Sequence, residues 1–347
     1  MLKAPIAITM GDAAGIGPEI IVKAYQLHPE LLAGCFVWGD VQVMRRAASL
    51  LNKGLVPQPI AAIGIPKDTW AVPPLCIPVL QEKGRLPEIP MGQVSAVAGA
   101  FAGNCVLSAA RAAMHDEVSA LVTAPLHKEA LSAAGAPFSQ FPGHTEMLQA
   151  VAAEHMSRSV EEVPVRMMLA NDELRTVLVS IHVSLRNAID AVTFENVLQT
   201  LLITHASLFK VLGRAPRIAV AGLNPHAGEG GLFGREELDV IVPAMQAAAA
   251  QSCHLSGPWA PDTVFMRARH KQGLDPEFDV VVAMYHDQGL IPVKYLGIQK
   301  GVNVTLGLPL VRTSPDHGTA FDIAGRGSAD PSSLIEAIRM AQALITS

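Results

Sequence analysis

Five short apolar runs recur along the chain, and each of them ends at a polar turn. They cover residues 5–10, 119–123, 174–181, 217–223 and 279–285. Segments with the period of a helix lie between them, for example at 19–27, 93–114 and 194–212. Parallel strands need long crossover connections, and these are usually helices. The alternation therefore predicts an α/β fold built on a largely parallel, doubly wound sheet.

Size and charge narrow the class of protein further. The 347 residues fit two domains or one large α/β unit. Half of the residues are hydrophobic and 16% are charged, which excludes wholesale disorder. With 26 basic and 31 acidic side chains the net charge is −5, and there is no block of Lys or Arg. We therefore expect no nucleic-acid partner, because such binding relies on phosphate neutralisation.

The cysteines and the apolar stretches indicate the cellular compartment in which the protein is expected. The four cysteines are widely spaced and form no CxxC pair, and a chain of this size does not need disulfides. Pro5 and Gly11 break the N-terminal apolar run too early for a signal peptide. The uncharged stretches 89–110 and 240–261 contain Gln, Ser and Gly, so they favour buried or amphipathic helices over membrane spans. We expect a soluble, cytoplasmic protein that contacts no membrane.

Four histidines lie at or just after the C-terminal ends of predicted strands: His127, His182, His226 and His286. In open α/β sheets this edge is where ligands bind. A single histidine in such a place can simply form hydrogen bonds in a turn. Four at equivalent positions favour a shared functional site.

Three of these histidines could bind a divalent metal ion. Neutral imidazole is a good ligand for Zn²⁺, and three protein ligands leave one position open for substrate. His182, His226 and His286 are too far apart for a local zinc signature, so their spacing alone leaves ordinary turn contacts as the alternative. Polar neighbours that could orient such ligands are Asn224, Glu229, Asp287 and Gln288.

Two further segments could bind an anion or a nucleotide. Residues 142–146 (PGHTE) precede a helical stretch, so free N–H groups and the Thr145 hydroxyl could bind an anion there, unless Thr145 is an ordinary cap. Lys294, Asn303 and Arg312 follow later in the chain, and Arg312 suits bidentate binding of phosphate or carboxylate. The Gly-rich stretch 316–327 is either a surface turn or a loop that carries a nucleotide, with Asp322 on the ribose hydroxyls.

Residues 11–19 (GDAAGIGPE) match neither GxGxxG nor a Walker loop. They predict a strand, a tight turn and a helix that opens with Pro18 and Glu19. Together with DHGTAFDIAGRGSADP near the end of the chain, they resemble segments of decarboxylating β-hydroxyacid dehydrogenases of the isopropylmalate/isocitrate type. Between them, TAPLHKEAL, PGHTEML, VSIHVSLR, GLNPHAGEGGLFG, MYHDQGLIPVKY and GVNVTLGLPLVRTSPDHGTA resemble the 4-hydroxythreonine-4-phosphate dehydrogenase family of vitamin B6 biosynthesis. The similarity extends over essentially the whole chain.

The resemblance implies an isocitrate/isopropylmalate dehydrogenase-like fold of two α/β domains with a central cleft. Residues 1–138 and 308–347 would form a discontinuous cofactor-side domain, and 139–307 the substrate-binding, metal-binding and dimerisation domain. The enzyme would be a homodimer with its active site at the interface. Its metal ligands would be His182, His226 and the partner subunit's His286.

The resemblance also assigns roles to single residues. Substrate-binding positions are His144, Thr145, Lys294, Asn303 and Arg312. Cofactor-binding positions are His317, Gly318 and Asp322. Candidates for proton transfer, or for orienting a metal ligand, are Asp262, Asp287 and Lys128. Because Asp322 would repel a 2′-phosphate near the expected ribose, we expect NAD in preference to NADP.

The implied activity is oxidation with decarboxylation of 4-phosphooxy-L-threonine to 3-amino-2-oxopropyl phosphate in pyridoxal phosphate biosynthesis. It would use NAD or NADP and one divalent ion per subunit, Zn, Co or Mg. One alternative is a 4-phospho-threonate/erythronate 3-dehydrogenase of sugar-acid catabolism, which the extra residues 139–141 and 154–162 keep open. Others are a terephthalate 1,2-cis-dihydrodiol dehydrogenase and a regulatory protein that binds phosphate esters without chemistry. The intact GHTE segment with Lys294 and Arg312 argues for a phosphorylated hydroxy-acid substrate.

Overall fold

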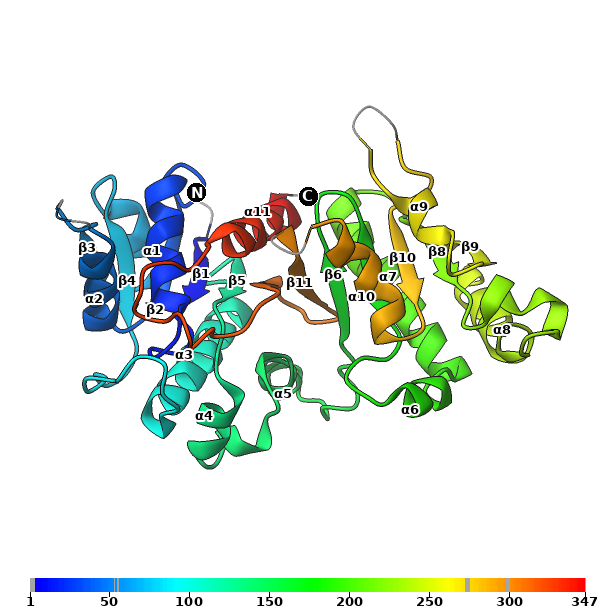
Figure 1. Ribbon diagram of the computed structural model, residues 1–347, viewed down its shortest axis with the longest axis horizontal. Coiled ribbons are helices and arrows are strands. Elements are labelled where there is room, and N and C mark those ends of the chain that lie inside the picture. Colours follow the sequence, from blue (N-terminus) through cyan, green and yellow to red (C-terminus); the bar gives the residue numbers. More distant parts are fainter. Residues whose placement is uncertain (1–3, 53, 55, 272–274, 298–299, 347) are drawn as a thin grey trace. The chain divides into compact units, whose positions relative to one another are not determined.

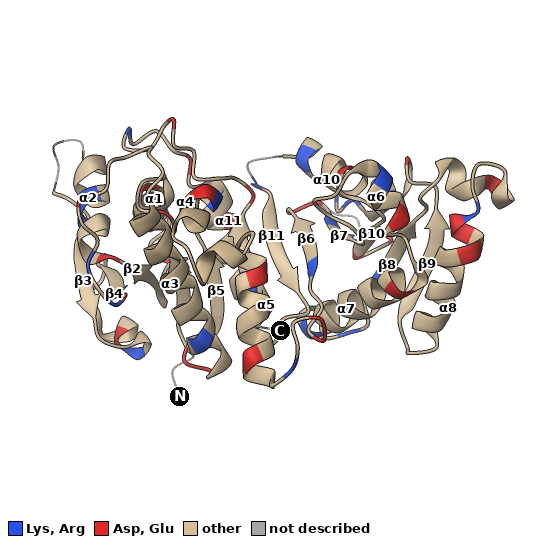
Figure 2. Cartoon of the chain, turned by 90° about the horizontal axis from the view of Figure 1, so that it is seen from below, with Lys and Arg blue, Asp and Glu red and all other residues tan. Residues whose placement is uncertain are grey.

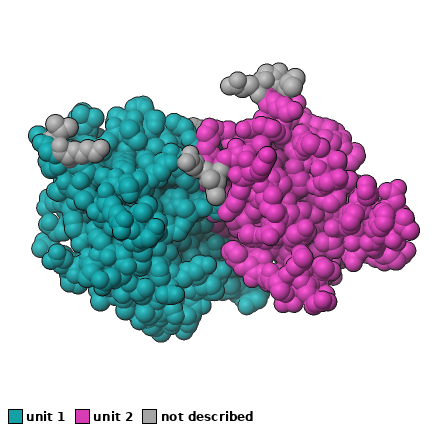
Figure 3. All heavy atoms as spheres, viewed as in Figure 1, with its two compact units in different colours: residues 1–164, 308–345 teal, residues 165–307, 346–347 magenta. Residues whose placement is uncertain are grey.

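The computed structural model describes residues 4–52, 54, 56–271, 275–297 and 300–346 (Figure 1). The chain divides into two compact units, coloured separately in Figure 3. Unit 1 comprises residues 1–164 and 308–345, and residues 165–307 form the body of unit 2. Each is an α/β unit, as predicted. Acidic and basic residues are interspersed along the elements of both (Figure 2).

Unit 1 is a parallel α/β sheet with the strand order β3-β4-β2-β1-β5-β12. Its strands are β1 (Ile6–Thr9), β2 (Cys35–Gly39), β3 (Ile60–Ile63), β4 (Ile77–Gln81), β5 (Ala120–Thr123) and β12 (Arg312–Pro315). Its helices are α1 (Gly17–Leu27), α2 (Val41–Leu51), α3 (Ala96–Met114), α4 (Lys128–Ala133), α5 (His144–Met156) and α11 (Ser332–Thr346), with short 3-10 turns η1 (Pro66–Ala71) and η2 (Phe138–Gln140). The central strands are wholly buried, which explains why they appear in the sequence as continuous apolar runs.

Unit 2 has the strand order β11-β6-β7-β10-β8-β9. Its strands are β6 (Arg166–Ala170), β7 (Arg175–Leu178), β8 (Arg217–Ala221), β9 (His254–Trp259), β10 (Val280–Ala283) and β11 (Val302–Leu306). Its helices are α6 (Leu185–Asp190), α7 (Phe194–Leu212), α8 (Val242–Ala249), α9 (Val264–Ala268) and α10 (His286–Tyr295), with the irregular turns η3 (Pro225–Gly231) and η4 (Glu237–Ile241). The strands β7, β10, β8 and β9 are parallel, but β6 is antiparallel to both β7 and β11. The sheet of unit 2 is therefore mixed.

The boundary between the units differs from the prediction on one side. The chain leaves unit 1 after Pro164, where the resemblance implied residue 138, and it returns to unit 1 at Leu308. The reason is α5, whose residues Met147, Leu148 and Val151 belong to the same buried cluster as residues of α3. Since α5 contributes to the core of unit 1, the possible anion-binding residues 142–146 at its N-terminus belong to unit 1 as well. We call these residues the anion segment.

One described helix, α3, is long and apolar enough to cross a membrane by composition alone. More than half (56%) of its most apolar window is buried inside the protein. It contacts β1, β2 and β5 on one side and the helices α4 and α5 on others. Its apolar character is thus that of a core helix. The second uncharged stretch, 240–261, is divided among η4, α8 and β9.

Candidate active site

The N-terminus of α5 is an uncapped helix end inside unit 1. Gly143 precedes it in an extended conformation (φ 179°), and no side chain caps the helix. The first N–H groups of α5 are therefore available to an anion. A Cβ placed on Gly143 would lie 3.6 Å from Oε2 of Glu146 and 3.9 Å from Cε of Lys128, so a carboxylate and a cation both stand beside the helix end. Thr145 lies half-buried in the first turn.

Arg312 supplies a second cation to this region from β12. Its side chain is 6% exposed, and its Nε and Nη2 donate hydrogen bonds to Oγ1 of Thr123, at 3.2 and 2.7 Å. Burial lowers the pKa of Arg312 to about 10, while the nearby Glu146 carboxylate acts in the opposite direction. At neutral pH the guanidinium is therefore charged and largely removed from water, where it interacts strongly with an anion.

His144 lies beside these cations. Burial, Arg312 and Lys128, in that order of importance, hold the pKa of His144 well below 6.5. Its ring is therefore neutral at physiological pH. Its Nε2 is fully covered and has no hydrogen-bond partner. A neutral ring next to two cations contributes hydrogen bonding without adding charge. Of the predicted substrate residues, His144, Thr145 and Arg312 thus gather in unit 1, while Lys294 (last turn of α10) and Asn303 (β11) belong to unit 2.

The predicted metal ligands follow three neighbouring parallel strands of unit 2. His182 follows β7, His286 follows β10 and His226 follows β8, and β10 pairs with both other strands. The rings of His182 and His286 lie with centroids 5.6 Å apart. His226 lies on η3, with its ring 6.1 Å from that of Phe233. Among the residues that the structure describes, no three His, Cys, Asp or Glu side chains are grouped closely enough to hold a metal. Within one chain, His182 and His286 are therefore neighbours, but the three predicted ligands do not form a metal site together.

A hydrogen bond orients the ring of His286, and another side chain links two of the segments that carry the histidines. Nδ1 of His286 contacts Oδ1 of Asp287 at 2.7 Å, which leaves Nε2 as the nitrogen for a ligand. Gln288 connects two strand ends: its amide donates to the carbonyl of Gly222 and accepts from the N–H of Met284, both at 2.7 Å. The loops that carry His226 and His286 are thus linked through one side chain.

The turn that carries His226 is left-handed. Residues 226–230 all have positive φ, and three of them, His226, Ala227 and Glu229, are not glycine. Such residues cost about 1–2 kcal/mol each in this conformation. The buried carboxylate of Glu237 stabilises the turn, because it accepts hydrogen bonds from the N–H groups of Leu223 and Asn224 at 2.7 and 2.8 Å. Sequence reasoning missed Glu237, since its partners lie more than a dozen residues away in the chain.

The predicted nucleotide loop, residues 316–327, lies against the GDAAGIGPE segment in unit 1. The N–H of Ile16 donates to the carbonyl of Thr319 at 3.0 Å. Phe321 stacks on His127 with centroids 4.3 Å apart and an interplanar angle of 16°. Asp322 and Gly318 are exposed, and His317 is half-buried with its Nε2 covered and without a partner. The contact between the two segments was not predicted, because neither motif encodes a partner 300 residues away.

Asp12, in the same part of unit 1, is another residue that the sequence analysis did not single out. It is fully buried, and its Oδ1 accepts a hydrogen bond from the N–H of Ala14 at 2.8 Å. Its Oδ2 is covered and has no partner. Burial raises the pKa of Asp12, against the hydrogen bond from Ala14 and the nearby His127.

The three proton-transfer candidates occupy separate places. Lys128 is exposed at the start of α4, beside the anion segment. Asp287 is exposed and bonded to His286. Asp262 is exposed in the turn before α9. Within unit 2, Asp287 is thus the candidate in direct contact with a predicted metal ligand.

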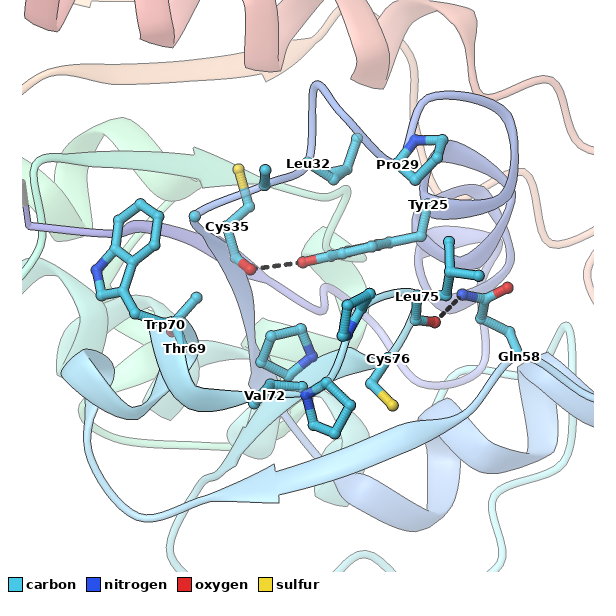
Figure 4. Close-up of a pocket in the computed structure, with 15 residues that line it drawn as sticks. Tyr25, Pro29, Leu32, Cys35, Gln58, Thr69, Trp70, Val72, Leu75 and Cys76 are labelled. Atoms are coloured by element: carbon cyan, nitrogen blue, oxygen red, sulfur yellow. Dashed lines mark hydrogen bonds between the residues drawn. The ribbon is translucent and has the colours of Figure 1, made fainter.

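Unit 1 contains a cavity of about 320 Å³, and none of the predicted site residues of this unit is among the described residues that line it (Figure 4). It is at the amino ends of β2 and β4, whereas His127 follows the carboxyl end of the parallel strand β5. Its wall is largely apolar, and two of its polar groups are bonded within it: Tyr25 donates to the carbonyl of Cys35 at 2.7 Å, and Gln58 donates to that of Leu75. These two groups are therefore not available to orient a ligand.

Comparisons with known proteins place the chain among dehydrogenases. A family model described as pyridoxal phosphate biosynthetic protein PdxA matches residues 32–341. A 4-hydroxythreonine-4-phosphate dehydrogenase of Beijerinckia indica is 50% identical over 336 residues, covering 96% of this chain and 93% of the relative. A D-threonate 4-phosphate dehydrogenase of Cupriavidus necator is 44% identical, covering 98% and 97%. The crystal structure of a 4-hydroxythreonine-4-phosphate dehydrogenase from Klebsiella pneumoniae has a TM-score of 0.86 at 38% identity, covering 100% and 99%.

Proposed function

The chain belongs to the PdxA family of pyridoxal phosphate biosynthetic proteins, and from this membership we propose that it oxidises and decarboxylates 4-phosphooxy-L-threonine with NAD and a divalent metal ion. The product would be 3-amino-2-oxopropyl phosphate. The observation that carries this proposal is the 50% identity with a 4-hydroxythreonine-4-phosphate dehydrogenase over nearly the whole chain. An oxidoreductase acting on a small phosphorylated hydroxy acid agrees with the names of the other relatives as well.

The anion segment of unit 1 supports a phosphorylated substrate. The free N–H groups of α5, the Thr145 hydroxyl, Lys128 and the buried Arg312 together provide hydrogen bonds and positive charge in a protein whose net charge is −5. The neutral His144 adds a hydrogen-bonding nitrogen at the same place. The cis-dihydrodiol of terephthalate carries two carboxylates but no phosphate, so a site suited to a phosphate monoester favours the phosphorylated hydroxy acids over that alternative.

The histidines of unit 2 fit a divalent ion in their donor chemistry, because neutral imidazole is a good ligand for such ions. Asp287 fixes the ring of His286 as carboxylates do for metal-binding histidines. His182, His226 and the partner subunit's His286 would hold the ion. When bound, such an ion lowers the pKa of the substrate alcohol and stabilises the enolate left by loss of CO₂. Asp287 then acts as an orienting group, Lys128 binds the phosphate, and Asp262 is the remaining candidate for proton transfer.

The loop 316–327 would receive the dinucleotide. Asp322 is exposed on it and could bond the ribose hydroxyls, whereas its negative charge would repel a 2′-phosphate. His317 and Gly318 lie on the same loop. This arrangement supports NAD over NADP.

A homodimer would cover an apolar surface of unit 2. Large apolar side chains are exposed on the segments that follow the three histidines in the chain, among them Tyr295 at 89% and Leu232 at 72%. Further members of this surface are Val183, Leu185, Ile189, Phe233, Leu238 and Ile291. Exposed apolar patches of this kind mark interaction sites. A second copy of the chain that binds here would bring its own histidines to the same place. We propose that the enzyme is cytoplasmic.

D-Threonate 4-phosphate is the second candidate substrate, favoured by the 44% identity with a dehydrogenase of that name. Both compounds share the phosphate and the secondary alcohol, so one experiment separates them. NAD⁺ reduction is measured side by side with 4-phosphohydroxythreonine, 4-phosphothreonate, 4-phosphoerythronate and a cis-dihydrodiol. The proposal expects the highest kcat/KM with the first. A clear preference for phosphothreonate would replace the substrate, and no NADH from any phosphorylated compound would overturn the proposed reaction.

A further inference from the structure

The buried carboxylate of Glu19 is bonded to the loop on which the cofactor would lie. Glu19 lies in the first turn of α1 and is 1% exposed. Its two oxygens accept hydrogen bonds from the N–H groups of Gly325, at 2.5 Å, and Gly327, at 2.9 Å. One turn further along α1, Lys23 donates to the carbonyl of Ala329. Two side chains of one helix therefore bind the segment 325–329.

The two glycines have the backbone that this contact needs. Gly325 (φ +79°) and Gly327 (φ +65°) are both in the left-handed region, which turns their N–H groups toward one carboxylate. A Cβ on Gly325 would lie 3.1 Å from Cγ of Met91, so the position has little room for a side chain. Arg326 lies between the two glycines, and its N–H donates to the carbonyl of Ile323 within the loop. The carboxylate of Glu19 thus accepts from two alternate N–H groups and stabilises the loop's conformation.

The rest of the loop is positioned by further contacts upstream. Phe321 stacks on His127, and the carbonyl of Thr319 accepts from the N–H of Ile16. Asp322 lies exposed between these contacts and the two glycines bound by Glu19. The conformation that presents Asp322 is thus defined from both sides, and Glu19 supplies the side nearer to α11.

We propose that Glu19 is a positioning residue for the dinucleotide, because its carboxylate holds residues 316–327 in the conformation that binds the cofactor. This inference rests on the proposed NAD-dependent function. Glutamine at position 19 would keep one acceptor oxygen, but its NH₂ group would face a backbone N–H. One hydrogen bond is then lost inside a buried site, and the loop loosens while the metal and phosphate residues stay in place.

The test compares Glu19→Gln with Glu30→Gln, which makes the same chemical change on an exposed residue of unit 1. NAD⁺ binding is measured by calorimetry in the absence of substrate, and the exchange of the loop amides by hydrogen–deuterium exchange. We expect Glu19→Gln to raise the Kd for NAD⁺ by roughly 10-fold and to speed exchange in 316–329, as expected for a lost hydrogen bond to a charged group. The KM for NAD⁺ should rise with it, while kcat at saturating NAD⁺ and the KM for substrate should stay within about twofold.

The outcomes separate this inference from the proposed function. An unchanged Kd in Glu19→Gln, with normal binding by the wild type, overturns the role of Glu19 alone. Failure of the wild type to bind NAD⁺ or NADP⁺ overturns the proposed function together with this role. If Glu19→Gln does not fold, the wild type decides: NAD⁺ must protect the amides of 316–329 from exchange, and absence of that protection counts against the inference.

Discussion

The guanidinium of Arg312 is bound to the hydroxyl of Thr123 through both Nε and Nη2, across two neighbouring parallel strands of unit 1. This contact fixes the planar group where it stands, almost fully out of water. The position of its charge is therefore determined by the contact between the two strands, and the side chain has little freedom to move. An anion that reaches Arg312 meets a cation that is already oriented.

Replacing Arg312 by Lys should weaken substrate binding far more than a charge-conserving change usually does. Lysine cannot reproduce the planar fork, so one hydrogen bond to a charged group is lost, about 1.5–3 kcal/mol. We expect KM for the phosphorylated substrate to rise roughly 10- to 150-fold, with a smaller change in kcat. Steady-state kinetics measure it, with Arg339→Lys on α11 as the control. A KM within twofold of the wild type would remove Arg312 from the phosphate site.

His144 should make stability depend on pH below its ordinary pKa. Because burial, Arg312 and Lys128 lower its pKa in the folded protein, the unfolded chain binds this proton first. The contribution to folding is complete above pH 6.5 and is lost as the pH falls below it, by up to about 1.4 kcal/mol per pH unit. Urea unfolding should show a shallower dependence in His144→Gln. His155→Gln, on the same helix but exposed, is the control, and equal slopes in the two variants would contradict the prediction.

Asp287→Asn should weaken metal binding without removing a ligand. The carboxylate that accepts the Nδ1–H of His286 at 2.7 Å would become a neutral amide, which reduces the basicity of Nε2. We expect the affinity for Zn²⁺ or Co²⁺ to fall roughly 10- to 100-fold. Titration with a competing chelator measures this, and Asp172→Asn in the same unit is the control. Undiminished activity of the wild type after thorough metal removal would contradict the metal requirement itself.

Glu237→Gln should destabilise the left-handed turn that carries His226. The N–H groups of Leu223 and Asn224 would lose a charged acceptor in a buried place, at a cost of about 1–3 kcal/mol. Chemical denaturation gives the free energy of unfolding, and Asp239→Asn, which breaks only the exposed ion pair with Arg235, is the matched change. Equal stability of the two variants would mean that the turn does not depend on Glu237.

A charge on the apolar surface of unit 2 should prevent the proposed homodimer from forming. Ile291 is 63% exposed on α10 and belongs to this surface. We expect Ile291→Asp to sediment as a monomer, with loss of activity, and Leu27→Asp on α1 to remain dimeric. A dimer that persists in Ile291→Asp and in Leu185→Asp would place the interface elsewhere.

The sequence predicts what depends on local pattern. Continuous apolar runs identify β1, β5, β7, β8 and β10, and the four histidines that follow the last four of these strands are found with them, because the periodicity of buried strands is a property of neighbouring residues. The position of α5 in unit 1 and the antiparallel direction of β6 could not be predicted. Both depend on which elements pack or pair with one another in the folded chain, and no local pattern records this. The same holds for Glu19 and Glu237, whose partners lie far along the chain and whose own residue types are common on surfaces.

Gln288 has one amide group, and it connects the carbonyl of Gly222 with the N–H of Met284. The segments after β8 and β10 are consequently coupled within one chain. If the proposed dimer forms, His226 serves the chain's own metal site and His286 serves the partner's, so Gln288 would connect the two metal sites of the dimer.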